Sequence, residues 1–338
     1  MRRVALALVL SLAAAAPAAP AFAWGAHGHR LVGRLATEAL PAEVPGFLRT
    51  PRAIDDIGEL ARELDRSKGS GKIHDHDRDA GHFVDIDEEG RVLGGPKFAP
   101  FPATKADYET GLRAANLDMW KAGYLQYSII DGYQQLVKDF TYWRILTIVE
   151  KRAKSAEQRR YYRADRIRRE ALLIRDLGVW AHYVGDASQP LHASIHYNGW
   201  GDYPNPKGYS QERSIHGVFE GEAVTANVTA ASAKARMQPF DDCQCAVEQR
   251  VADFLVGSAA QAEPIYVLWA DKVFKEPNPR AAAFLNDRIA AGASELRDLV
   301  VLAWRESANG SIGYRPTISV KDVESGKADP WKDLYGKD

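Results

Sequence analysis

The stretch Trp180-Ala-His-Tyr-Val-Gly-Asp-Ala-Ser-Gln-Pro-Leu-His192 decides the predicted fold and the predicted functional site. His182 and Asp186 are four residues apart, so on an α-helix their side chains project from one face and can bind the same cation. Pro190 is expected to end this helix, and the turn after it brings His192 beside the pair, at a position suited to a neighbouring metal. One His/Asp pair at helical spacing is more often a satisfied polar pair than a metal site, so further ligands must come from the rest of the chain.

The first 23 residues have the features of a secretory signal peptide. Arg2 and Arg3 precede an apolar run, and the segment ends in small residues at Ala23. Cleavage after Ala23 would give a mature chain that starts at Trp24 and is secreted or periplasmic. No later stretch of about twenty residues lacks charged side chains, so no integral membrane segment is expected after signal cleavage.

The charges of the chain nearly cancel, because 44 Lys and Arg residues face 45 Asp and Glu residues. Proteins that hold duplex nucleic acid by charge alone are usually strongly basic, so this mode of binding is disfavoured. An anionic substrate must therefore be held by a local group of charges. One local excess lies between residues 151 and 175, where ten Lys or Arg residues occur. Such a run is usually a solvated helix face, and a surface for anionic lipid or nucleic acid is the alternative interpretation.

The apolar pattern after residue 106 predicts an all-α protein. An aromatic stripe over 107–151 has broken helical spacing, and two further long helices are expected at 247–274 and 279–308. The chain has no linker-like segment and no internal repeat, so residues 24–338 are predicted to form a single compact multi-helix domain with long irregular loops. The tail from about residue 310 is polar and is expected to lie on the surface.

Residues 41–81 are predicted to be mainly loop, with one short helix around residues 55–63. The acidic, His-rich piece at 74–79 is interpreted as a solvated loop tip rather than a metal cluster. Residues 85–90 resemble the start of a calcium loop, but Pro96 stands where that loop needs its bidentate Glu. A turn after a short extended segment is therefore the simpler prediction.

The two cysteines, Cys243 and Cys245, are separated by one residue. A disulfide between them would need a strained loop, although an exported protein permits one. Their state stays open at the level of the sequence.

Other metal-type ligands occur before and after the opening stretch. His216 and Glu220 have the same four-residue spacing as the first pair, and His82 is available as a further ligand. Cleavage before Trp24 would free an α-amino group that can bind a metal together with the adjacent carbonyl, and His29 could complete that site. Taken alone, the segment that begins at Trp24 is more simply interpreted as an amphipathic first helix whose imidazoles lie on the surface.

Taken together, these motifs resemble those of the superfamily of secreted zinc-dependent phospholipases C and fungal and plant single-strand-specific nucleases. The resemblance extends from Trp24 to about Glu220. Its motifs are Trp24-Gly-x-x-Gly-His29, His82-Phe-x-Asp85, His182-Tyr-Val-Gly-Asp186-x-x-Gln-Pro-Leu-His192 and His216-x-x-x-Glu220. Their joint occurrence in this order is highly specific, and it implies an all-α fold with three Zn²⁺ ions in the site.

The resemblance also implies which residues hold each zinc ion. The first ion would be bound by His82, His182 and Asp186. The second would be bound by the Trp24 amine and carbonyl, by His29 and again by Asp186, which would bridge the two ions. The third would be bound by His192, His216 and Glu220.

Members of the superfamily carry one more acidic ligand before the motif that starts at His82. Asp65 is the preferred match here, and Asp75, Asp77 and Asp79 are the alternatives. In the nucleases a cation three residues past this ligand contacts phosphate, which here is Lys68, with Arg66 as a rival. Phe83 and Asp85 match positions at which the nucleases stack on and hydrogen-bond a base.

The implied reaction is hydrolysis of a phosphate ester. A metal pair bridged by Asp186 would lower the pKa of a shared water to give hydroxide near neutral pH, and the third metal would neutralise the leaving oxygen. The five-residue step from Trp24 to His29 is typical of the nucleases, which act on single-stranded nucleic acid or nucleotides. Glu220 is more typical of the phospholipases, which act on a phospholipid headgroup.

The expected function is therefore a single-strand-preferring nuclease of the endonuclease or 3′-nucleotidase type, with a zinc-dependent phospholipase C as the alternative. Trp200, Tyr203 and Tyr209 could either expose apolar surface around the site mouth or stack bases. An exported zinc-binding protein without catalytic activity is a second alternative. It is disfavoured because structural zinc sites are closed by four protein ligands, and the ligand sets implied here leave open positions.

Overall fold

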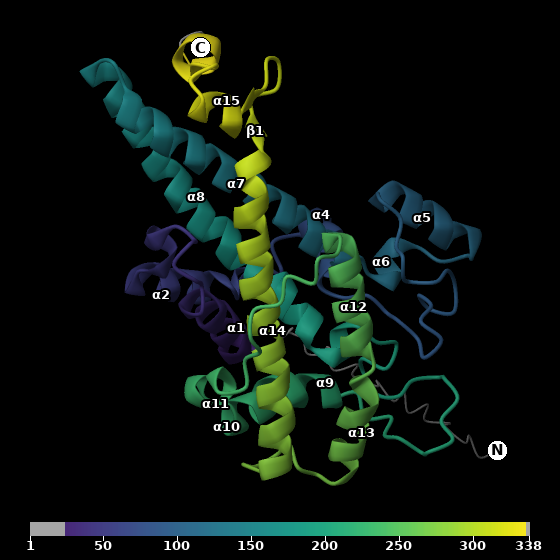
Figure 1. Cartoon of the computed structure of the whole chain (residues 1–338). Helices are drawn as coiled ribbons and strands as arrows, with labels where there is room; N and C mark the ends of the chain where they lie inside the picture. Colours follow the sequence, from purple (N-terminus) through teal and green to yellow (C-terminus); the bar gives the residue numbers. More distant parts are fainter. Residues whose placement is uncertain (1–23, 336–338) are drawn as a thin grey trace, which may run out of the picture.

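Three long helices organise the molecule, which the structure, a computed structural model, describes from residue 24 to residue 335. They are α7 (Leu125–Arg152), α8 (Ala156–Ser188) and α14 (Pro279–Glu306). α7 and α8 lie side by side, and α14 packs against both (Figure 1). The predicted all-α fold is confirmed, whereas the predicted signal peptide lies outside the described residues.

Shorter helices surround this frame. α1 (Ala26–Glu38) and α2 (Pro51–Leu60) pack against each other and against α8. The remaining α-helices are α3 (Glu63–Arg66), α4 (Lys72–Asp79), α5 (Lys105–Ala114), α6 (Met119–Ala122), α9 (Ile215–Gly217), α10 (Val224–Asn227), α11 (Ala230–Lys234), α12 (Val247–Ala259), α13 (Ala262–Ala270) and α15 (Val320–Glu324). Short 3₁₀ or π turns lie at η1 (Gly46–Arg49), η2 (Ala80–His82), η3 (Pro190–His192), η4 (Val218–Ala223), η5 (Ser307–Asn309) and η6 (Trp331–Tyr335).

The ends of α8 and α14 follow from their sequences. Ser155 caps the start of α8, where its side chain accepts a hydrogen bond from the Gln158 backbone N–H. The same helix ends at Ser188, as predicted from Pro190. Asn278 caps α14, and Pro279 occupies its first turn, where a missing N–H costs nothing.

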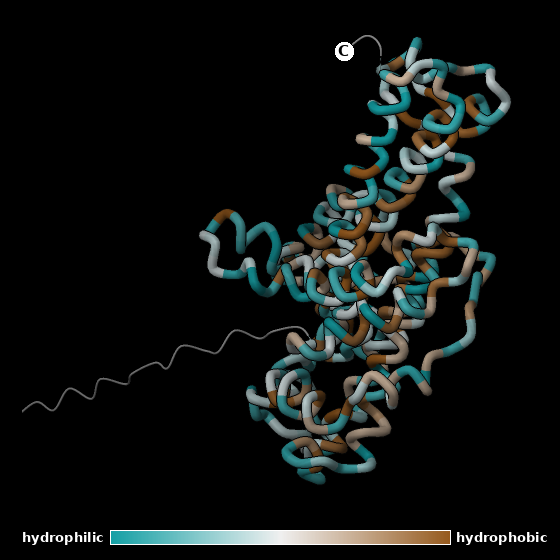
Figure 2. The backbone as a smooth tube through the Cα atoms, turned by 90° about the vertical axis from the view of Figure 1, so that its left-hand side faces the viewer, coloured by the Kyte–Doolittle hydropathy of each residue, from teal (hydrophilic) through white to brown (hydrophobic). Residues whose placement is uncertain are grey.

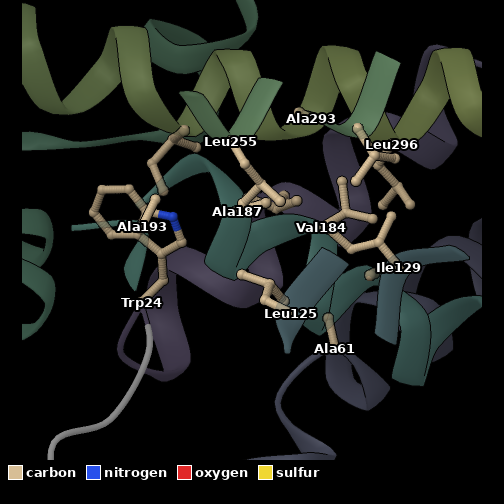
Figure 3. Close-up of a cluster of buried hydrophobic side chains, with 14 of the residues drawn as sticks. Trp24, Ala61, Leu125, Ile129, Val184, Ala187, Ala193, Leu255, Ala293 and Leu296 are labelled. Atoms are coloured by element: carbon tan, nitrogen blue, oxygen red, sulfur yellow. The ribbon is translucent and has the colours of Figure 1, made fainter. Parts of the chain in front are cut away.

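The hydrophobic core lies beneath α14. Trp24, Val184, Leu255 and Leu296 meet there from four different parts of the chain (Figure 3). Each large apolar side chain that is fully buried contributes roughly 1.5–3 kcal/mol to the stability of the fold. Along the backbone, hydrophobic and hydrophilic segments alternate, as expected of helices that bury one face (Figure 2).

Close packing of α7 on α8 depends on a glycine. Trp180 of α8 lies over Gly132 of α7 and donates a hydrogen bond of 2.9 Å from its Nε1 to the Ile129 carbonyl. A Cβ at residue 132 would lie 2.1 Å from the Trp180 ring. The two helices that support the opening stretch can therefore approach this closely only because residue 132 has no side chain.

Two predicted elements differ from the observed ones. The helix expected over 247–274 is wrong as a single element, because it breaks between α12 and α13. Pro264 explains the break, since its nitrogen cannot donate to the Ala260 carbonyl and its ring would clash with that group. The loop tip expected at 74–79 is the helix α4, and Asp75 supports its start by accepting hydrogen bonds from the Gly69 N–H.

The C-terminal segment is more structured than a polar surface tail. Strand β1 (Ser311–Ile312) pairs antiparallel with β2 (Ile318–Ser319), and α15 follows directly. The buried side chains of Ile312, Ile318 and Val323 pack with those of α7 and with Tyr162 of α8 to form a small second hydrophobic cluster. This cluster supports the end of the α7–α8 pair that lies farthest from α1 and α2 (Figure 1).

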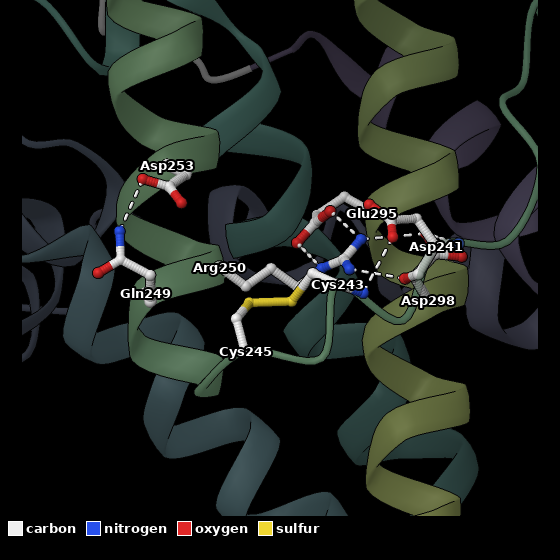
Figure 4. The surroundings of a disulfide bond; sticks show 8 residues. All are labelled: Asp241, Cys243, Cys245, Gln249, Arg250, Asp253, Glu295 and Asp298. Carbon is white, nitrogen blue, oxygen red and sulfur yellow. Dashed lines mark hydrogen bonds and ion pairs between the residues drawn. A yellow bond between two sulfur atoms is a disulfide. The ribbon is translucent and has the colours of Figure 1, made fainter.

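A group of buried charges joins α12 to α14; we call Arg250, Glu295, Arg297 and Asp298 the arginine cluster. Arg250 donates to both Glu295 oxygens at 2.8 and 2.7 Å and to Asp298 Oδ2 at 3.0 Å (Figure 4). Arg297 donates to Asp298 Oδ1 at 2.7 Å and to the backbone carbonyls of Gln238 and Pro239. Every charge in this cluster therefore has a partner of opposite sign.

The cysteines lie beside the arginine cluster. Cys243 and Cys245 form a disulfide in the loop before α12, with their Cα atoms 5.2 Å apart (Figure 4). Cys243 and Gln244 both have positive φ angles, 37° and 49°, so the expected strain is present in the loop backbone. Among residues 24–335, no helix is long and apolar enough to cross a membrane.

Candidate metal centre

All the side chains predicted to bind metal gather in one place, which we call the metal-ligand cluster. They come from seven elements: His29 on α1, Asp65 on α3, His82 in η2, His182 and Asp186 on α8, His192 in η3, His216 on α9, and Glu220 in η4. All are buried except Asp65, which is partly buried. The α8 residues lie in the last two turns of that helix, so the other elements converge on its C-terminal end.

Two groups of potential ligands share the end of α8. His29, His182 and Asp186 form one group, and Asp65, His82 and His182 form the other, with the ligand atoms of each group within 4.8 Å of one another. Asp186 directs its two oxygens to different partners. Oδ1 lies 3.5 Å from His29 Nε2, and Oδ2 lies 3.0 Å from His82 Nδ1. The Asp186 carboxylate therefore has the position that a bridging ligand requires.

The acidic residue that joins these groups is Asp65. Its two oxygens lie 3.9 Å from His29 Nε2 and 3.9 Å from His182 Nε2. Asp75 instead accepts from the Gly69 N–H, and Asp77 is exposed beside His76. Asp79 lines the adjacent pocket but belongs to none of the candidate ligand groups found in residues 24–335. The structure thus brings Asp65, and none of the three alternatives, into the cluster.

A third group consists of His192, His216 and Glu220. His216 Nε2 lies 3.0 Å from Glu220 Oε2 and 3.1 Å from His192 Nε2. Gln189, which was not predicted to belong to the site, also contacts this group: its side-chain N–H group lies 3.4 Å from Glu220 Oε2 and 3.3 Å from His216 Nε2. The sequence signal for Gln189 was its position inside the motif, between the ligands Asp186 and His192.

Backbone carbonyls set the orientation of three imidazoles. The Nδ1 atoms of His182, His192 and His216 lie 2.8, 2.7 and 2.9 Å from the carbonyls of Ala61, His82 and Tyr197 respectively. Because a carbonyl can only accept, each Nδ1 carries a proton, and each Nε2 faces the cluster, where it can bind a metal ion in the neutral form of the ring. This is the arrangement that orients histidine ligands on a metal ion.

Several lone pairs that meet in the cluster lack proton donors. Both ring nitrogens of His29, Asp186 Oδ1 and Glu220 Oε1 have no hydrogen-bond partner among the residues that the structure describes. Buried polar atoms rarely lack a hydrogen bond, because each unsatisfied atom costs about 1–3 kcal/mol of folding free energy. A cation bound among these atoms would satisfy them, so the residues fit a metal ion.

Burial also shifts the protonation of four side chains in the cluster toward the neutral forms. It lowers the pKa of His29 and His82, and it lowers that of His182 to about 3. The pKa of Asp186 is raised, first by burial and then by the nearby Asp65 carboxylate. Neutral imidazoles are ready to bind a metal, and a divalent cation would return the carboxylates to their charged form.

Trp24 is held next to these groups. Its side chain is buried, and its Nε1 donates a 2.9 Å hydrogen bond to Ser188 Oγ at the end of α8. The Gly25 N–H donates to the Glu220 carbonyl at 3.0 Å. The start of the predicted mature chain therefore lies beside α8 and η4, although the Trp24 nitrogen is part of a peptide bond in the full-length chain.

A pocket of about 340 Å³ opens beside His82, His192 and His216. Its other walls include Lys68, Phe83 and Asp85, the three residues predicted to contact substrate. Lys68 Nζ lies 2.8 Å from Asp65 Oδ1. Burial raises the pKa of Asp85 well above the usual value for an aspartate. On these walls Lys68 could bind a phosphate, Phe83 could stack on a planar ring, and Asp85 could hydrogen-bond to the polar edge of that ring.

Trp200, Tyr203 and Tyr209 do not line this pocket. Trp200 is only 6% exposed and stacks on His196, with the ring centroids 3.6 Å apart. Trp200, Tyr203 and Tyr209 line a different cavity, together with Glu88 and Glu263. Their predicted place at the site mouth is therefore wrong, because the Trp200 ring is needed to pack the loop. Tyr197, which the sequence analysis did not single out, lines the pocket instead.

Comparison of this chain with models of protein families, with curated proteins and with solved structures found no match. The chemistry of the site is therefore argued from its own geometry. Three buried groups of His, Asp and Glu side chains could each hold a metal ion.

Proposed function

We propose that the mature protein is an exported, zinc-dependent hydrolase of phosphate esters that acts on single-stranded nucleic acid or nucleotides. One observation carries the proposal. Asp186 lies between two ligand groups, and His82 of the second group and His192 and His216 of the third line a pocket that also contains Lys68. Three closely spaced cations next to a lysine would hold and polarise a phosphate, whereas a storage or structural site does not need a substrate-sized pocket.

Zinc is the proposed metal because the ligands are imidazoles and carboxylates without cysteine. When bound, the ions would supply Lewis acidity and activate water for attack on phosphorus. The protein residues hold and orient the substrate. The Lys68 ammonium would pair with a phosphate oxygen, because it lies on the pocket wall next to the ligand Asp65.

The walls of the pocket favour a nucleotide over a lipid. The Phe83 ring can stack on a base, and Asp85 can hydrogen-bond to the base edge. A phospholipase that works on membranes should instead expose a group of apolar residues around the mouth. Tyr197 is the exposed aromatic residue among those lining this pocket, and it too can stack on a base.

The test uses mature protein that begins at Trp24. Hydrolysis of single-stranded RNA and DNA is compared with hydrolysis of phosphatidylcholine, each with chelator and after zinc is added back. Release of nucleotides that chelator abolishes and zinc restores is the expected result. Cleavage of lipid alone would transfer the protein to the phospholipase alternative, with Glu220 as the next residue to change. No turnover of either substrate would favour the non-catalytic zinc-binding protein.

Phe83→Ala and Asp85→Asn sharpen the test. Both should raise the KM for nucleic acid about tenfold or more, as expected when a stacked or hydrogen-bonded base loses its partner. Tyr203→Ala is the matched control, since Tyr203 lines the other cavity and should leave the KM unchanged.

A further inference from the structure

The first half of α8 and the end of α7 form a projecting arm, which we define as residues 156–175 of α8 with the part of α7 packed on them. In Figure 1 the arm extends to the upper left, beyond α1 and α2. Since α8 is one continuous helix, the arm is rigidly joined to the metal-ligand cluster. At about 1.5 Å per residue, Arg160 lies roughly 33 Å from His182 along the axis.

The basic residues of the arm divide into two sets. Arg166 and Arg169 turn toward α7, where they bind Glu150 and Asp139 at 2.6 Å and hold the two helices together. Five others are exposed to solvent: Arg159, Arg160, Arg163, Arg168 and Arg175. The run of charge seen in the sequence is therefore only partly structural.

The exposed arginines are weakly compensated. Within residues 24–335, Arg159, Arg160 and Arg163 make no ion pair. Arg168 lies 3.9 Å from Asp165, and Arg175 pairs with its neighbour Asp176 at 2.6 Å. The exposed surface of α8 in the arm thus carries a net positive charge on a protein whose total charge is close to zero.

Toward the metal-ligand cluster α8 becomes buried, because α2 packs on it next to Gly178 and His182 has no exposed surface. Arg168, Arg175 and His182 follow one another at seven-residue intervals, so each is rotated only about 20° from the one before. Beside His182, the chain continues from Ala61 into α3, where Arg62 and Arg66 line a cavity of about 350 Å³ together with Asp65 and Glu220. Arg62 and Arg66 pair with Glu59 and Glu63 at 3.0 and 3.1 Å, so the uncompensated positive charge lies on the arm and not along the way to the cluster.

We propose that the arm is a docking surface for the phosphate backbone of a single-stranded nucleic acid whose scissile bond lies at the metal-ligand cluster. The inference rests on the proposed function and specifies its substrate as a polynucleotide rather than a mononucleotide. Arginine suits this role, because its planar guanidinium pairs with phosphate in a bidentate manner.

An anionic membrane fits the arm less well. A helix that lies on a membrane needs a broad apolar face. On the arm, Ile167 and Leu172 are exposed, at 52% and 43%, but they are interrupted by the arginines. The apolar side chains on the opposite face, such as Leu173 and Leu177, are buried in the core.

The test measures binding of a hydrolysis-resistant, phosphorothioate-linked 20-nucleotide single strand to the zinc-loaded mature protein by fluorescence anisotropy. The variant Arg159→Gln/Arg160→Gln/Arg163→Gln removes three charges from the arm. The control Lys97→Gln/Lys272→Gln/Lys275→Gln removes three exposed charges from the loop before α5 and the turn before α14. Thermal unfolding should show the same midpoint for all three proteins, because none of the six residues is buried.

The arm variant is expected to bind about tenfold more weakly near 0.1 M salt, while the control binds as the unchanged protein does. Three lost phosphate contacts should also reduce the slope of log affinity against log salt by about 2, since each contact on a single strand contributes roughly 0.7. In hydrolysis assays, kcat/KM should fall for the corresponding phosphodiester 20-mer and stay unchanged for a dinucleotide.

Failure of this inference can be told apart from failure of the proposed function. Equal binding by the arm variant and the unchanged protein would overturn the docking surface, even if nucleic acid is hydrolysed. Binding to phosphatidylglycerol vesicles, with no binding to the strand, would overturn it in favour of a membrane. Arm-dependent binding of the strand without hydrolysis would support the docking surface and count against the proposed nuclease.

Discussion

The protein contains two buried polar clusters, which differ in whether their own side chains balance the charge of their carboxylates. In the arginine cluster two guanidinium groups face two carboxylates, and backbone carbonyls take the remaining donors. In the metal-ligand cluster five imidazoles face three carboxylates, and the lone pairs of neighbouring groups point at one another. The first cluster is complete as it stands, whereas the second needs positive charge.

The difference separates a structural role from a functional one. A buried charge that is already paired holds two helices together, and removing one partner leaves the other without compensation. A cluster that lacks a cation gains little from being buried, and burial shifts its pKa values toward the uncharged forms. Such a cluster fits a bound cation, and its three ligand groups could hold metal ions.

Changing Asp186 should have the largest effect. Asp186→Asn keeps the shape of the side chain but removes the charge that lies between two ligand groups. We expect kcat/KM to fall on the order of 10³-fold, more than the roughly 10–100-fold loss typical of a residue that only supports a ligand. Steady-state kinetics on single-stranded RNA, with zinc content measured in parallel, checks this. Asp131→Asn, at an exposed position on α7, is the control and should be fully active. A variant that loses its fold together with its activity would indicate a structural metal site instead.

Arg250→Met should break the other cluster. It removes the partner of Glu295 and of Asp298 inside the protein, so the free energy of unfolding should fall by about 3–5 kcal/mol. Urea denaturation measures the loss. Arg236→Met removes an exposed partner of Asp287 and should cost no more than about 1 kcal/mol. Equal losses from the two variants would contradict the assignment of the arginine cluster as a buried stabilising network.

Removal of metal should affect only one of the clusters. Chelation should lower the free energy of unfolding by about 4 kcal/mol if free metal had been present at about a thousand times its Kd. Thermal unfolding with and without chelator measures the change. Arg250→Met should show the same decrease, since the clusters share no residue and their effects should add. Asp186→Asn should show a smaller decrease, and an undiminished one would mean that the metal binds elsewhere.

Asp85 allows a smaller test of burial itself. Its carboxyl group is buried, and its pKa is raised by burial, with Lys121 partly opposing the shift. The folded protein therefore keeps a proton that the unfolded chain releases above about pH 3.8. The stability that Asp85 contributes is present below that pH and is lost as the pH rises through the folded pKa. Asp85→Asn should accordingly gain stability relative to the unchanged protein between pH 4 and pH 8, as measured by urea denaturation. A difference that does not vary with pH would show that the carboxyl group is ionised in the fold.

Local features of the site followed from local sequence. The four-residue spacing of His182 and Asp186 and the position of Pro190 depend on backbone geometry within one helix, and α8 has the predicted end. The same holds for Asn278 and Pro279 at the start of α14. Pro264 shows the limit, because the apolar periodicity around it predicted one helix where its ring requires two.

The sequence by itself determined which kinds of ligand the protein carries and how they are spaced within each segment. Only the tertiary structure decided which acidic residue joins them: Asp65 meets His29 and His182 because α3 lies against α8, while Asp75 and Asp77 remain outside. It also decided that Trp200 packs the loop and that Arg166 is structural while Arg160 is exposed. The physical reason is that spacing along a chain sets only local geometry, whereas burial, carbonyl partners and charge balance depend on segments that folding brings together.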